Sequence, residues 1–543
     1  YYACYYLLFI ERIFWMKHKS FSLPSWLLPL LLMLLGSTLR LACLGSVPGG
    51  IHQDESFVAW NAFALLHEGM DSAGHVWPVY MADWGDGHSA LYVWMLIPFL
   101  ALNGGHISPI LSRLPQAIVS IFTLWAIYCL LKRMFDRKLA TWGLFLLAIC
   151  PWHIMMSRWG LDANLAPGFL IFGLYFFVRG IEDKRFLPLS GLFYGLSLYC
   201  YAVIWPIVPL LLLLQISYAL AFRKIRIDRY SVSAALILGI LAVPLLLFVC
   251  VNSRILPEIA LPFMTIPKMG GYRGSEVAFS LSKMYQNLRT ALSLLYHQNT
   301  GAPYDILLPW GLFYDIGRVF IVVGAVSLCI CVVKKLIQRT FAWETFLLIQ
   351  LIGGGFNCLI VTAVLHQIDA LYIPLVLCEA WGVYTLLQAL QKLRPYVSTV
   401  AASLSALCYL ICLILFQRDY YTEYRALTDA YFAKGVGQCV EYALQQCRET
   451  GISTISVEKG AQWPRLLFYT ETLPSQYLAT VTYDVAPAPS AFTTSDDIRI
   501  NTRIHYDEIN SDNIYIIYYT DKDIFSDSFT LTPFYDWYVA VPK

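Results

Sequence analysis

Carboxylate and imidazole side chains that could carry out acid–base chemistry gather in one polar stretch, residues 46–110, which follows a long apolar run. In order along the chain, the candidates are His52, Asp54, Glu55, Asp86, His88 and Tyr92. A carboxylate next to a membrane is costly unless it is solvated, paired or functional. Asp54 suits a general base that takes a proton from an acceptor hydroxyl. Capping is an equal alternative, because Asp54 and Glu55 open a predicted helix (56–66) whose dipole favours carboxylates there.

Three cations could hold a phosphate group at such a site. His88 lies in the same stretch, while Lys268 and Arg273 lie in a second polar stretch, residues 252–308. Positive charge stabilises a departing phosphate, so these side chains predict a phosphorylated ligand. Solvation at the surface would explain Lys268 equally well, and a position beside a helix would explain His88. Asp162, between two apolar runs, is either a second carboxylate of the site or the cap of the next helix.

A metal ion is compatible with the first polar stretch but is not implied by it. His52 offers a nitrogen ligand, and Asp54 and Glu55 would supply the oxygen ligands of such an ion. No spacing among these residues demands a divalent cation, so no cofactor is predicted to be required.

The elements that must position these residues are membrane helices. Of the 543 residues, 58% are hydrophobic and only 14% are charged, whereas a soluble domain is nearer half apolar and a quarter charged. This balance excludes a soluble enzyme, a disordered chain and a fibrous repeat. The formal net charge of +2 excludes a nucleic-acid binder that relies on bulk charge. Apolar runs of about 20 residues predict a polytopic α-helical membrane protein.

Eleven apolar runs are long enough to be candidate membrane spans. They lie at about residues 23–44, 111–131, 139–156, 163–180, 188–203, 204–222, 231–251, 309–333, 341–364, 369–391 and 397–416. Basic clusters fall between alternate runs, and short loops rich in Lys and Arg stay cytoplasmic. With about 11 spans, every cluster lies on one side. We therefore predict a multi-pass protein of the cell membrane with a cytoplasmic N-terminus.

One further apolar run, residues 89–103, does not fit this count. It is too short to span a membrane, and treating it as a span would invert every basic cluster after it. We expect it to form a helix at the outer surface. The regions predicted to lie outside are then residues 46–110, 252–308 and everything after about 417.

The chain is therefore predicted to have two domains, a transmembrane domain at residues 1–416 and an extracytoplasmic α/β domain at residues 417–543. The second domain contains a helical pattern at 436–447 and β-rich runs at 452–457 and 513–519.

Two smaller features of the sequence carry predictions of their own. Cys439 and Cys447 fall eight residues apart on one predicted helix, which is too far for a disulfide, so we expect none between them. Met16 is the first methionine, and the basic residues after it lead into the first apolar run, as in a signal anchor. Residues 1–15 are expected to lie outside the natural product, with the unusual N-terminus of a fragment as an equal alternative.

Several short motifs recur in an order that is typical of one class of membrane enzyme. They are Asp54-Glu55, the segment from Trp84 to His88, Arg113-Leu114-Pro115, Leu161-Asp162-Ala163, the segments 298–304 and 311–314, and Leu371-Tyr372-Ile373-Pro374. In this order the chain resembles the membrane glycosyltransferases of the GT-C class. The nearest branch is glycosyltransferase family 39, which contains the protein O-mannosyltransferases and the lipid A aminoarabinose transferases, and the chain is most similar to its bacterial members.

The resemblance implies a function and roles for particular residues. A sugar would pass with inversion from a polyprenyl-phosphate donor to an acceptor hydroxyl on a protein, lipid glycan or wall polymer, on the outer face of the membrane. Asp54 would be the catalytic base with Glu55 supporting it, and Asp162 would be a second carboxylate near the acceptor. His88 and Arg273 would face the donor phosphate, together with Lys268.

The chain also departs from the family pattern. Relatives often carry an Asn-Arg pair before the segment that begins at Leu371, but here His366 and Gln367 precede it, and His366 is the candidate replacement. No Lys occurs at residues 199–205, where some relatives have one, so the donor headgroup is open. The Trp-Trp-Asp motif of the oligosaccharyltransferases is absent from the sequence, which argues against N-glycosylation.

Two other functions compete with sugar transfer. A transporter or flippase for a lipid-linked sugar would place ionisable groups near the middle of the membrane and often shows internal repeats. Here the carboxylates gather outside the apolar runs, and no clear repeat is present. A receptor-like scaffold that binds through the C-terminal domain would leave Asp54 and Glu55 without a role.

Overall fold

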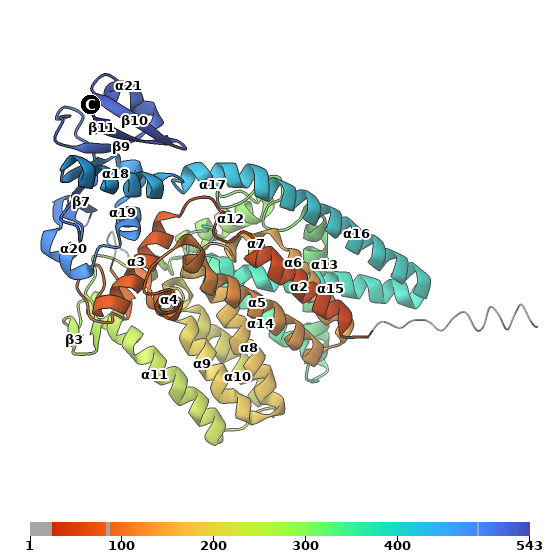
Figure 1. Cartoon of the computed structure of the whole chain (residues 1–543). Coiled ribbons are helices and arrows are strands. Elements are labelled where there is room, and N and C mark those ends of the chain that lie inside the picture. The colour runs from red at the N-terminus through yellow and green to blue at the C-terminus, as the bar shows by residue number, and fades with distance from the viewer. Residues whose placement is uncertain (1–23, 83–86, 486–487) are drawn as a thin grey trace, which may run out of the picture.

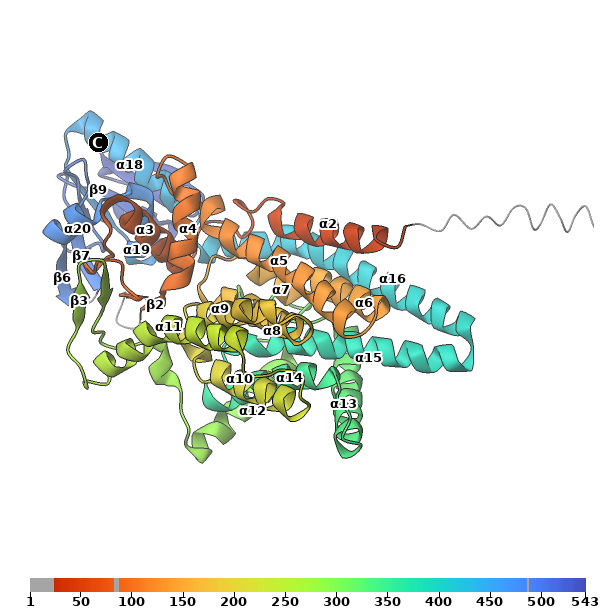
Figure 2. The same cartoon turned by 90° about the horizontal axis from the view of Figure 1, so that it is seen from below.

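The computed structural model describes residues 24–82, 87–485 and 488–543. It consists of a large helical body and a smaller C-terminal domain that contains a sheet (Figures 1 and 2). The predicted fold class is thereby confirmed. Asp86 and residues 1–15, on which predictions were made, lie outside the described residues.

Each of the 11 apolar runs contains at least one helix. In chain order the helices of this part are α2 (Leu27–Leu41), α5 (Pro109–Met134), α6 (Arg137–Ile149), α7 (Pro151–Met156), α8 (Ala166–Glu182), α9 (Leu187–Ser197), α10 (Ile207–Ala221), α11 (Arg229–Asn252), α13 (Asp315–Ile337), α14 (Glu344–Ile360), α15 (Tyr372–Leu393) and α16 (Pro395–Asp419). The run 139–156 is divided between α6 and α7 at Pro151, which has no N–H to continue the first helix.

The sequence also supplies the signals that begin these helices. The Ser108 side chain accepts a hydrogen bond from the Leu111 N–H at the start of α5, and Asp136 accepts one from the Leu139 N–H at the start of α6. Asp228 forms a capping box with Ser231 at the start of α11. Polar caps thus mark the points where the chain turns back into the apolar body.

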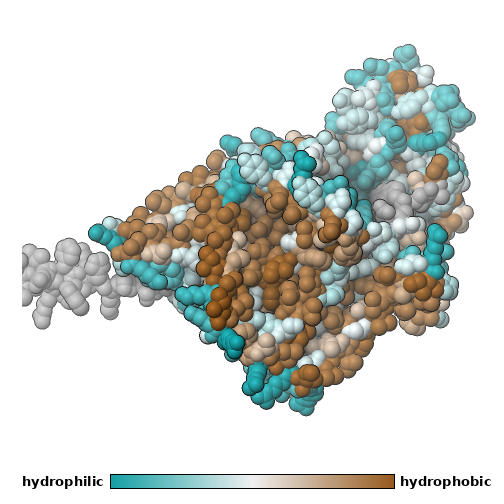
Figure 3. All heavy atoms as spheres, turned by 180° about the vertical axis from the view of Figure 1, so that it is seen from behind, coloured by the Kyte–Doolittle hydropathy of each residue, from teal (hydrophilic) through white to brown (hydrophobic). Residues whose placement is uncertain are grey.

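Within the described residues, seven helices are long and apolar enough to cross a membrane, and three shorter apolar helices accompany them. Figure 3 shows the consequence at the surface. One face of the helical body is largely hydrophobic, whereas the C-terminal domain is mostly hydrophilic or mixed. The chain is therefore a multi-pass membrane protein, while the count of 11 spans and the sidedness of the loops stay predictions.

Loop 46–110 folds into two helices rather than an extended connection. Helix α3 (Gln53–Glu68) begins three residues earlier than the predicted 56–66 helix, and the predicted 89–103 segment forms a helix, α4 (Ala90–Leu102). His52 is the N-cap of α3, and Asp54 and Glu55 occupy its first turn. Glu55 completes a capping box by accepting the His52 N–H, so the capping interpretation holds for Glu55. Helix α4 packs against α3 and α5, which anchors the loop to the body.

Loop 252–308 contains a short hairpin and one amphipathic helix. Strands β3 (Ile259–Leu261) and β4 (Met264–Ile266) pair antiparallel, and helix α12 (Leu281–His297) packs against α14. The segment between the hairpin and α12 carries Arg273.

The C-terminal domain is built on a seven-stranded sheet in the order β10-β11-β9-β5-β8-β7-β6. Its strands are β5 (Thr454–Val457), β6 (Thr482–Val485), β7 (Ala488–Thr493), β8 (Arg499–Asn501), β9 (Ile514–Tyr518), β10 (Phe529–Phe534) and β11 (Trp537–Pro542). Its helices are α18 (Val436–Thr450), α19 (Trp463–Thr470), α20 (Pro474–Thr480) and α21 (Lys522–Phe525). Strand β5 runs parallel to both β8 and β9, so the predicted α/β character is confirmed. The predicted helix at 436–447 lies within α18, and the predicted β-rich runs at 452–457 and 513–519 contain β5 and β9.

Helix α18 also carries the two cysteines of this domain. Cys439 and Cys447 are free thiols buried on this one helix, and burial raises their pKa values to about 12 and about 11.

The C-terminal domain follows the body without a flexible linker. Helix α16 continues through a π-helical turn (Tyr420–Tyr424) into α17 (Arg425–Tyr431), well past residue 416. The domain then rests on loop 46–110, and Figures 1 and 2 both show it beside α3 at one end of the body. The Trp60 indole donates to the Thr472 carbonyl at 3.0 Å, and the Arg465 guanidinium donates to the Ile51 carbonyl at 2.7 Å. The domain therefore fixes the loop that carries the candidate site.

Candidate active site

Glu55 is the centre of a fully paired, buried network. Its carboxylate accepts two hydrogen bonds from Arg113, at 3.0 and 3.1 Å, and both side chains have no exposed surface. It also accepts the Gly160 N–H at 2.8 Å and the His52 N–H at 3.0 Å. A paired carboxylate of this kind is expensive to disrupt, because removing one partner leaves the other charge buried alone.

Arg113 and Arg158 extend this network into the chain before the site. Besides Glu55, Arg113 donates to three carbonyls in the segment 44–50, at 2.8 to 3.2 Å. Arg158 donates to the Val47 carbonyl at 2.8 Å. A guanidinium has five N–H donors and no acceptor, so it can satisfy several inward-facing carbonyls at once. These arginines therefore shape the turn that leads to His52.

Asp54, next to Glu55, lies in a different environment. Its side chain is 28% exposed, and the His52 Nδ1 lies 3.7 Å from the Asp54 Oδ2. The His52 ring is surrounded by aromatic rings, with centroids of Trp159 at 5.0 Å, Phe432 at 5.1 Å and Tyr304 at 5.9 Å. Burial lowers the pKa of His52, although the Asp54 charge opposes that shift. His52 thus stays neutral near pH 7 and leaves the Asp54 carboxylate available.

Asp162 lies on the loop before α8 and is held in place by three contacts. Its Oδ2 accepts the Ser89 N–H at 2.8 Å, and its Oδ1 accepts the Ala163 N–H at 2.8 Å. The His88 Nδ1 lies 3.6 Å from the same Oδ1. The cap interpretation therefore holds for one oxygen of Asp162, while the carboxylate also brings His88 and the start of α4 to the site.

Arg273 reaches this region from loop 252–308. Its guanidinium donates to Glu276 at 2.8 Å, and the other Glu276 oxygen accepts a hydrogen bond from the Gln367 amide. Tyr201, between α9 and α10, is buried close enough to Arg273 and Asp162 for both charges to act on its hydroxyl. Arg273 is therefore tied to two further segments of the chain.

His366 occupies the point where these segments meet. Burial lowers its pKa, and the charges of Asp54, Asp162 and Arg273 all act on it. Its ring lies 6.1 Å from that of Tyr201, and within the described residues its Nδ1 has no hydrogen-bond partner. The structure thus brings together Asp54, His88, Asp162, Arg273 and His366 from five separate segments.

Two candidates from the sequence lie outside this cluster. Lys268 is exposed on the turn after the hairpin, where its backbone N–H is bonded to Glu258. The Tyr92 hydroxyl donates to the Ser112 carbonyl at 2.7 Å. Because Ser112 precedes Arg113, Tyr92 supports the segment that carries the partner of Glu55. Neither side chain is seen to approach the carboxylate of Asp54.

Sequence reasoning missed the buried residues that hold the site. Arg113 was noted only as part of a motif, yet it fixes both Glu55 and the segment 44–50. Asp305, in loop 252–308, is 7% exposed, and burial raises its pKa to about 6. Its neighbour Tyr304 contacts His52 and feels the charges of both Asp54 and Asp305. The one signal in the sequence is that Arg113 and Asp305 are charged residues in otherwise apolar or aromatic stretches.

A metal ion held by Asp54 and Glu55 together does not fit this arrangement. Both Glu55 oxygens already accept hydrogen bonds from Arg113 and from backbone N–H groups, so a metal would have to break a buried ion pair. Among the residues described by the structure, no group of three or more His, Cys, Asp or Glu side chains is arranged to hold a metal.

The chain was compared with family models, curated proteins and solved structures. Residues 87–248 match the family model described as dolichyl-phosphate-mannose-protein mannosyltransferase. No curated protein matches the sequence. The structure of ArnT from Cupriavidus metallidurans in the apo state superposes with a TM-score of 0.54 at 11% identity, over 94% of this chain and 97% of that chain.

Other solved structures give similar or weaker likenesses. The structure of the same ArnT bound to undecaprenyl phosphate gives a TM-score of 0.51 at 10% identity, with the same coverage of 94% and 97%. The apo form of the Archaeoglobus fulgidus oligosaccharyltransferase gives 0.46 at 12% identity, over 93% of this chain and 70% of that chain. The ArnT likeness covers nearly the whole of both chains, so the two share a fold. The chain thus has the fold of ArnT, and its residues 87–248 match the model of the mannosyltransferase family.

Proposed function

We propose that this protein transfers a sugar with inversion from a polyprenyl-phosphate donor to an acceptor hydroxyl, at the cluster formed by Asp54, His88, Asp162, Arg273 and His366. The observation that carries the proposal is this cluster itself, in which carboxylates and a guanidinium converge from five segments. The ArnT structure with undecaprenyl phosphate supports the donor class, because a protein of the same fold binds that lipid. The family model adds a polyprenyl-phosphate sugar as the expected kind of donor.

The proposed reaction needs one base and one cation. Asp54 takes the proton from the acceptor hydroxyl, and the hydroxyl oxygen forms a bond to the anomeric carbon of the donor sugar. The bond between that carbon and the phosphate oxygen breaks, and the lipid phosphate leaves with both electrons. Because the attack comes from the opposite face, the configuration at the anomeric carbon inverts and no covalent enzyme intermediate forms.

Arg273 is the proposed partner of the leaving phosphate. Its guanidinium is held by Glu276, and its charge acts on both Tyr201 and His366. A fixed cation aimed at the developing negative charge lowers the barrier without reorganising during the reaction. His88 can assist from the Asp162 side. Lys268, on the exposed turn, is proposed only as an outer contact for the donor.

We further propose that the site faces the outside of the cell and that the C-terminal domain is extracytoplasmic. The basic clusters between alternate apolar runs support this sidedness, because Lys- and Arg-rich short loops stay in the cytoplasm. Helices α3 and α4 of loop 46–110 and the C-terminal domain lie at one end of the helical body, so they would share one side of the membrane.

The test is transfer by the purified protein in nanodiscs, with a panel of polyprenyl-phosphate sugars. Each donor is offered with three acceptors, a Ser- and Thr-containing peptide, a lipid A-type glycolipid and a wall polymer, and products are identified by mass spectrometry. We expect one donor to be consumed by the wild-type chain and not by Asp54→Ala. Consumption of no donor, or equal product from Asp54→Ala, would contradict the proposal.

A further inference from the structure

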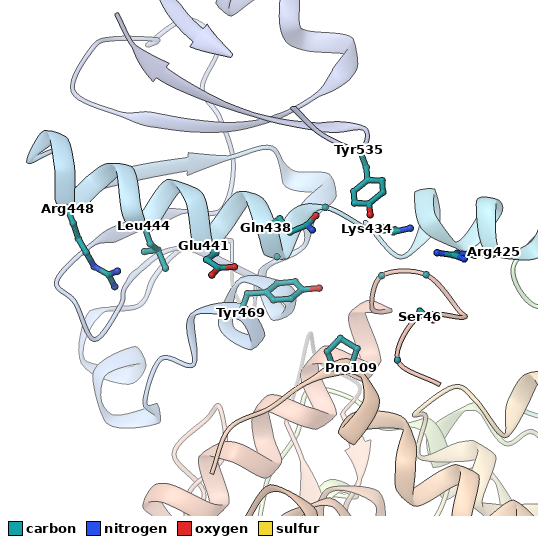
Figure 4. Close-up of a pocket in the computed structure, with 15 residues that line it drawn as sticks. Ser46, Pro109, Arg425, Lys434, Gln438, Glu441, Leu444, Arg448, Tyr469 and Tyr535 are labelled. Atoms are coloured by element: carbon teal, nitrogen blue, oxygen red, sulfur yellow. The ribbon is translucent and has the colours of Figure 1, made fainter. Parts of the chain in front are cut away.

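A cavity of about 710 Å³ lies between the C-terminal domain and the chain that leads into the site (Figure 4). Its floor is formed by Gly45, Ser46, Gly49 and Gly50, together with Pro109 at the start of α5. Its walls come from the start of α17, from α18, and from two tyrosines. The cavity is thus separate from the cluster around Asp54, and it joins the two parts of the molecule.

One wall is a polar face of α18. Gln438, Glu441, Leu444 and Arg448 follow each other at intervals of three or four residues, which places them on one side of a helix. Figure 4 shows these side chains on the side of the helix that faces the cavity. A row of amide, carboxylate and guanidinium groups offers hydrogen bonds to a ligand with many hydroxyls.

Two tyrosines add flat surfaces to these polar groups. The Tyr469 ring lies against α18 at Gly437, where a Cβ atom would come within 2.4 Å of the ring. Tyr535, on the turn before β11, is 58% exposed, and the Lys434 ammonium lies 4.3 Å from its ring centroid. Tyrosine combines an apolar face with a polar tip, so it can pack on a sugar ring and still donate a hydrogen bond.

The floor is almost bare backbone. Gly50 has a φ of +60°, and a Cβ atom there would come within 2.2 Å of the Phe432 carbonyl oxygen. A Cβ atom at Gly49 would come within 1.6 Å of the Asp429 Oδ1, and the Gly49 N–H donates to the Thr428 hydroxyl. These glycines therefore let the loop pack directly on the segment 429–434, which joins the floor of the cavity to its wall.

Four charged side chains line the cavity. Three cations line it, Arg425, Lys434 and Arg448, against one carboxylate, Glu441. Lys434 pairs with Asp429 and Arg448 with Asp496. Arg425 is exposed, and no hydrogen bond or ion pair of its side chain occurs among the described residues. Glu441 is likewise exposed, and its side chain has no hydrogen bond or ion pair among the described residues. Arg425 therefore offers a partner to an acidic group of a ligand, and Glu441 offers an acceptor to its hydroxyl groups.

We propose that this cavity binds an acidic saccharide, as an accessory site for the acceptor glycan of the transfer reaction. Amide, carboxylate and tyrosine groups would bind the sugar hydroxyls and ring faces, and Arg425 would bind a carboxylate or phosphate of the glycan. The inference rests on the proposed function for its biological role, but the binding itself does not depend on turnover. Leu444 and Pro109 are the apolar side chains of the lining other than the tyrosines, so an acyl chain would find little apolar surface here.

The floor also links the cavity to the reaction site. The Gly50 carbonyl accepts a hydrogen bond from Arg113, which pairs with Glu55, the neighbour of Asp54. A glycan bound here therefore rests on the same segment that carries the proposed base. This position suits a site that holds the acceptor while one of its hydroxyls enters the cluster.

The test is a calorimetric titration of the purified full chain with tetragalacturonate, with maltotetraose as its neutral counterpart. We expect tetragalacturonate to bind at least tenfold more tightly than maltotetraose, and to bind more weakly as salt is raised from 50 to 500 mM. Arg425→Glu should lower its affinity at least tenfold and Gln438→Ala several-fold. Lys522→Glu, the same charge change at an exposed site elsewhere in the domain, should stay within twofold of wild type.

Several outcomes would overturn the proposal. They are no binding of tetragalacturonate, equal binding of the neutral saccharide, and affinity that Arg425→Glu leaves unchanged. Displacement of the saccharide by millimolar inorganic phosphate would indicate a simple phosphate site instead. Asp54→Ala protein should bind tetragalacturonate as wild type does, so a failure of the transfer assay and a failure of this site are read separately.

Discussion

The first turn of α3 places two neighbouring carboxylates in opposite environments. Glu55 points into the protein, where Arg113 and two backbone N–H groups satisfy it completely. Asp54 points toward the convergence of five segments, keeps 28% of its side chain exposed and has no comparable ion pair with an arginine in the described structure. The two residues share chemistry and sequence context, and only their partners differ.

We expect this difference to give the two carboxylates different roles, with Glu55 stabilising the fold and Asp54 taking part in the reaction. A carboxylate whose oxygens are all engaged cannot accept a substrate proton without breaking a buried pair, whereas a partly exposed one can. The Glu55 side is therefore expected to set stability, and the Asp54 side to set the rate of transfer. The resemblance to the family grouped both residues as catalytic, so this division can be tested directly.

The largest effect is expected on the Glu55 side. Glu55→Ala leaves the Arg113 guanidinium buried without its carboxylate, which costs about 3–5 kcal/mol. We expect a large fall in the thermal unfolding temperature in detergent and loss of the folded protein on gel filtration. Glu423→Ala, which removes an exposed carboxylate of the same type, is the matched control. Normal stability in Glu55→Ala would show that the network does not hold the loop.

Asp54→Asn should give the opposite result. The amide keeps the shape of the carboxylate but cannot take a proton, so transfer should fall by about 10²–10⁴-fold, as for the loss of a general base. The unfolding temperature should stay within about one degree of wild type, since no buried ion pair is lost. Single-turnover kinetics with the active donor measures the rate. If Asp54→Asn lowered the unfolding temperature as much as Glu55→Ala, the two carboxylates would not have the separate roles that we propose.

Asp305 extends the comparison to a buried carboxylate with no cation beside it in the described structure. Its pKa is raised to about 6 by burial, against 3.8 for the free side chain, so the unfolded chain releases this proton more readily. Stability from this group is therefore present below about pH 4 and is lost as pH rises through about 6. Asp305→Asn should be more stable than wild type above pH 6, by on the order of 3 kcal/mol at most.

Thermal unfolding of both proteins between pH 4 and pH 8 checks this prediction. The difference between them should shrink toward pH 4, where the folded wild-type carboxyl is protonated and the unfolded one is partly protonated. A difference that does not change with pH would mean that Asp305 is not the group that titrates.

The smallest effect is expected for Arg273→Gln. The change removes a charge but keeps a hydrogen-bond donor near Glu276, so the fold should be unaffected. We expect kcat/KM for the lipid donor to fall roughly tenfold, about 1.4 kcal/mol, because a cation stabilises the leaving phosphate. Arg289→Gln, an exposed arginine on α12 in the same loop, serves as the control. Equal donor kinetics in the two variants would remove Arg273 from the site.

Much of the fold could be predicted because it follows from local pattern. Each apolar run contains a helix, and the helix at α18 and the strands β5 and β9 match their periodicity. The predicted start of α3 was too late, since His52 caps the helix, whereas Asp54 and Glu55 were expected to open it. Helix boundaries depend on single hydrogen bonds, which hydrophobic pattern does not encode.

The candidate site was predictable only as a set of reactive side chains. Asp54, His88, Asp162 and Arg273 were chosen for their chemistry, and the folded chain brings them together from distant segments. His366 was chosen because a family arginine is missing, and it lies where the charges of the others act on it. Lys268 and Tyr92 met similar criteria but point elsewhere, because nothing in their local sequence reveals which way a loop turns.

The sequence by itself determined that this chain lives in a membrane, that polar loops carry its reactive groups, and that its last part is an α/β domain. Those properties arise from composition and periodicity, which act over neighbouring residues. Tertiary structure alone decided that Glu55 is locked to Arg113 while Asp54 stays accessible, and that the C-terminal domain grips the loop before them. Those choices depend on contacts between residues as far apart as Ile51 and Arg465, which no local pattern specifies.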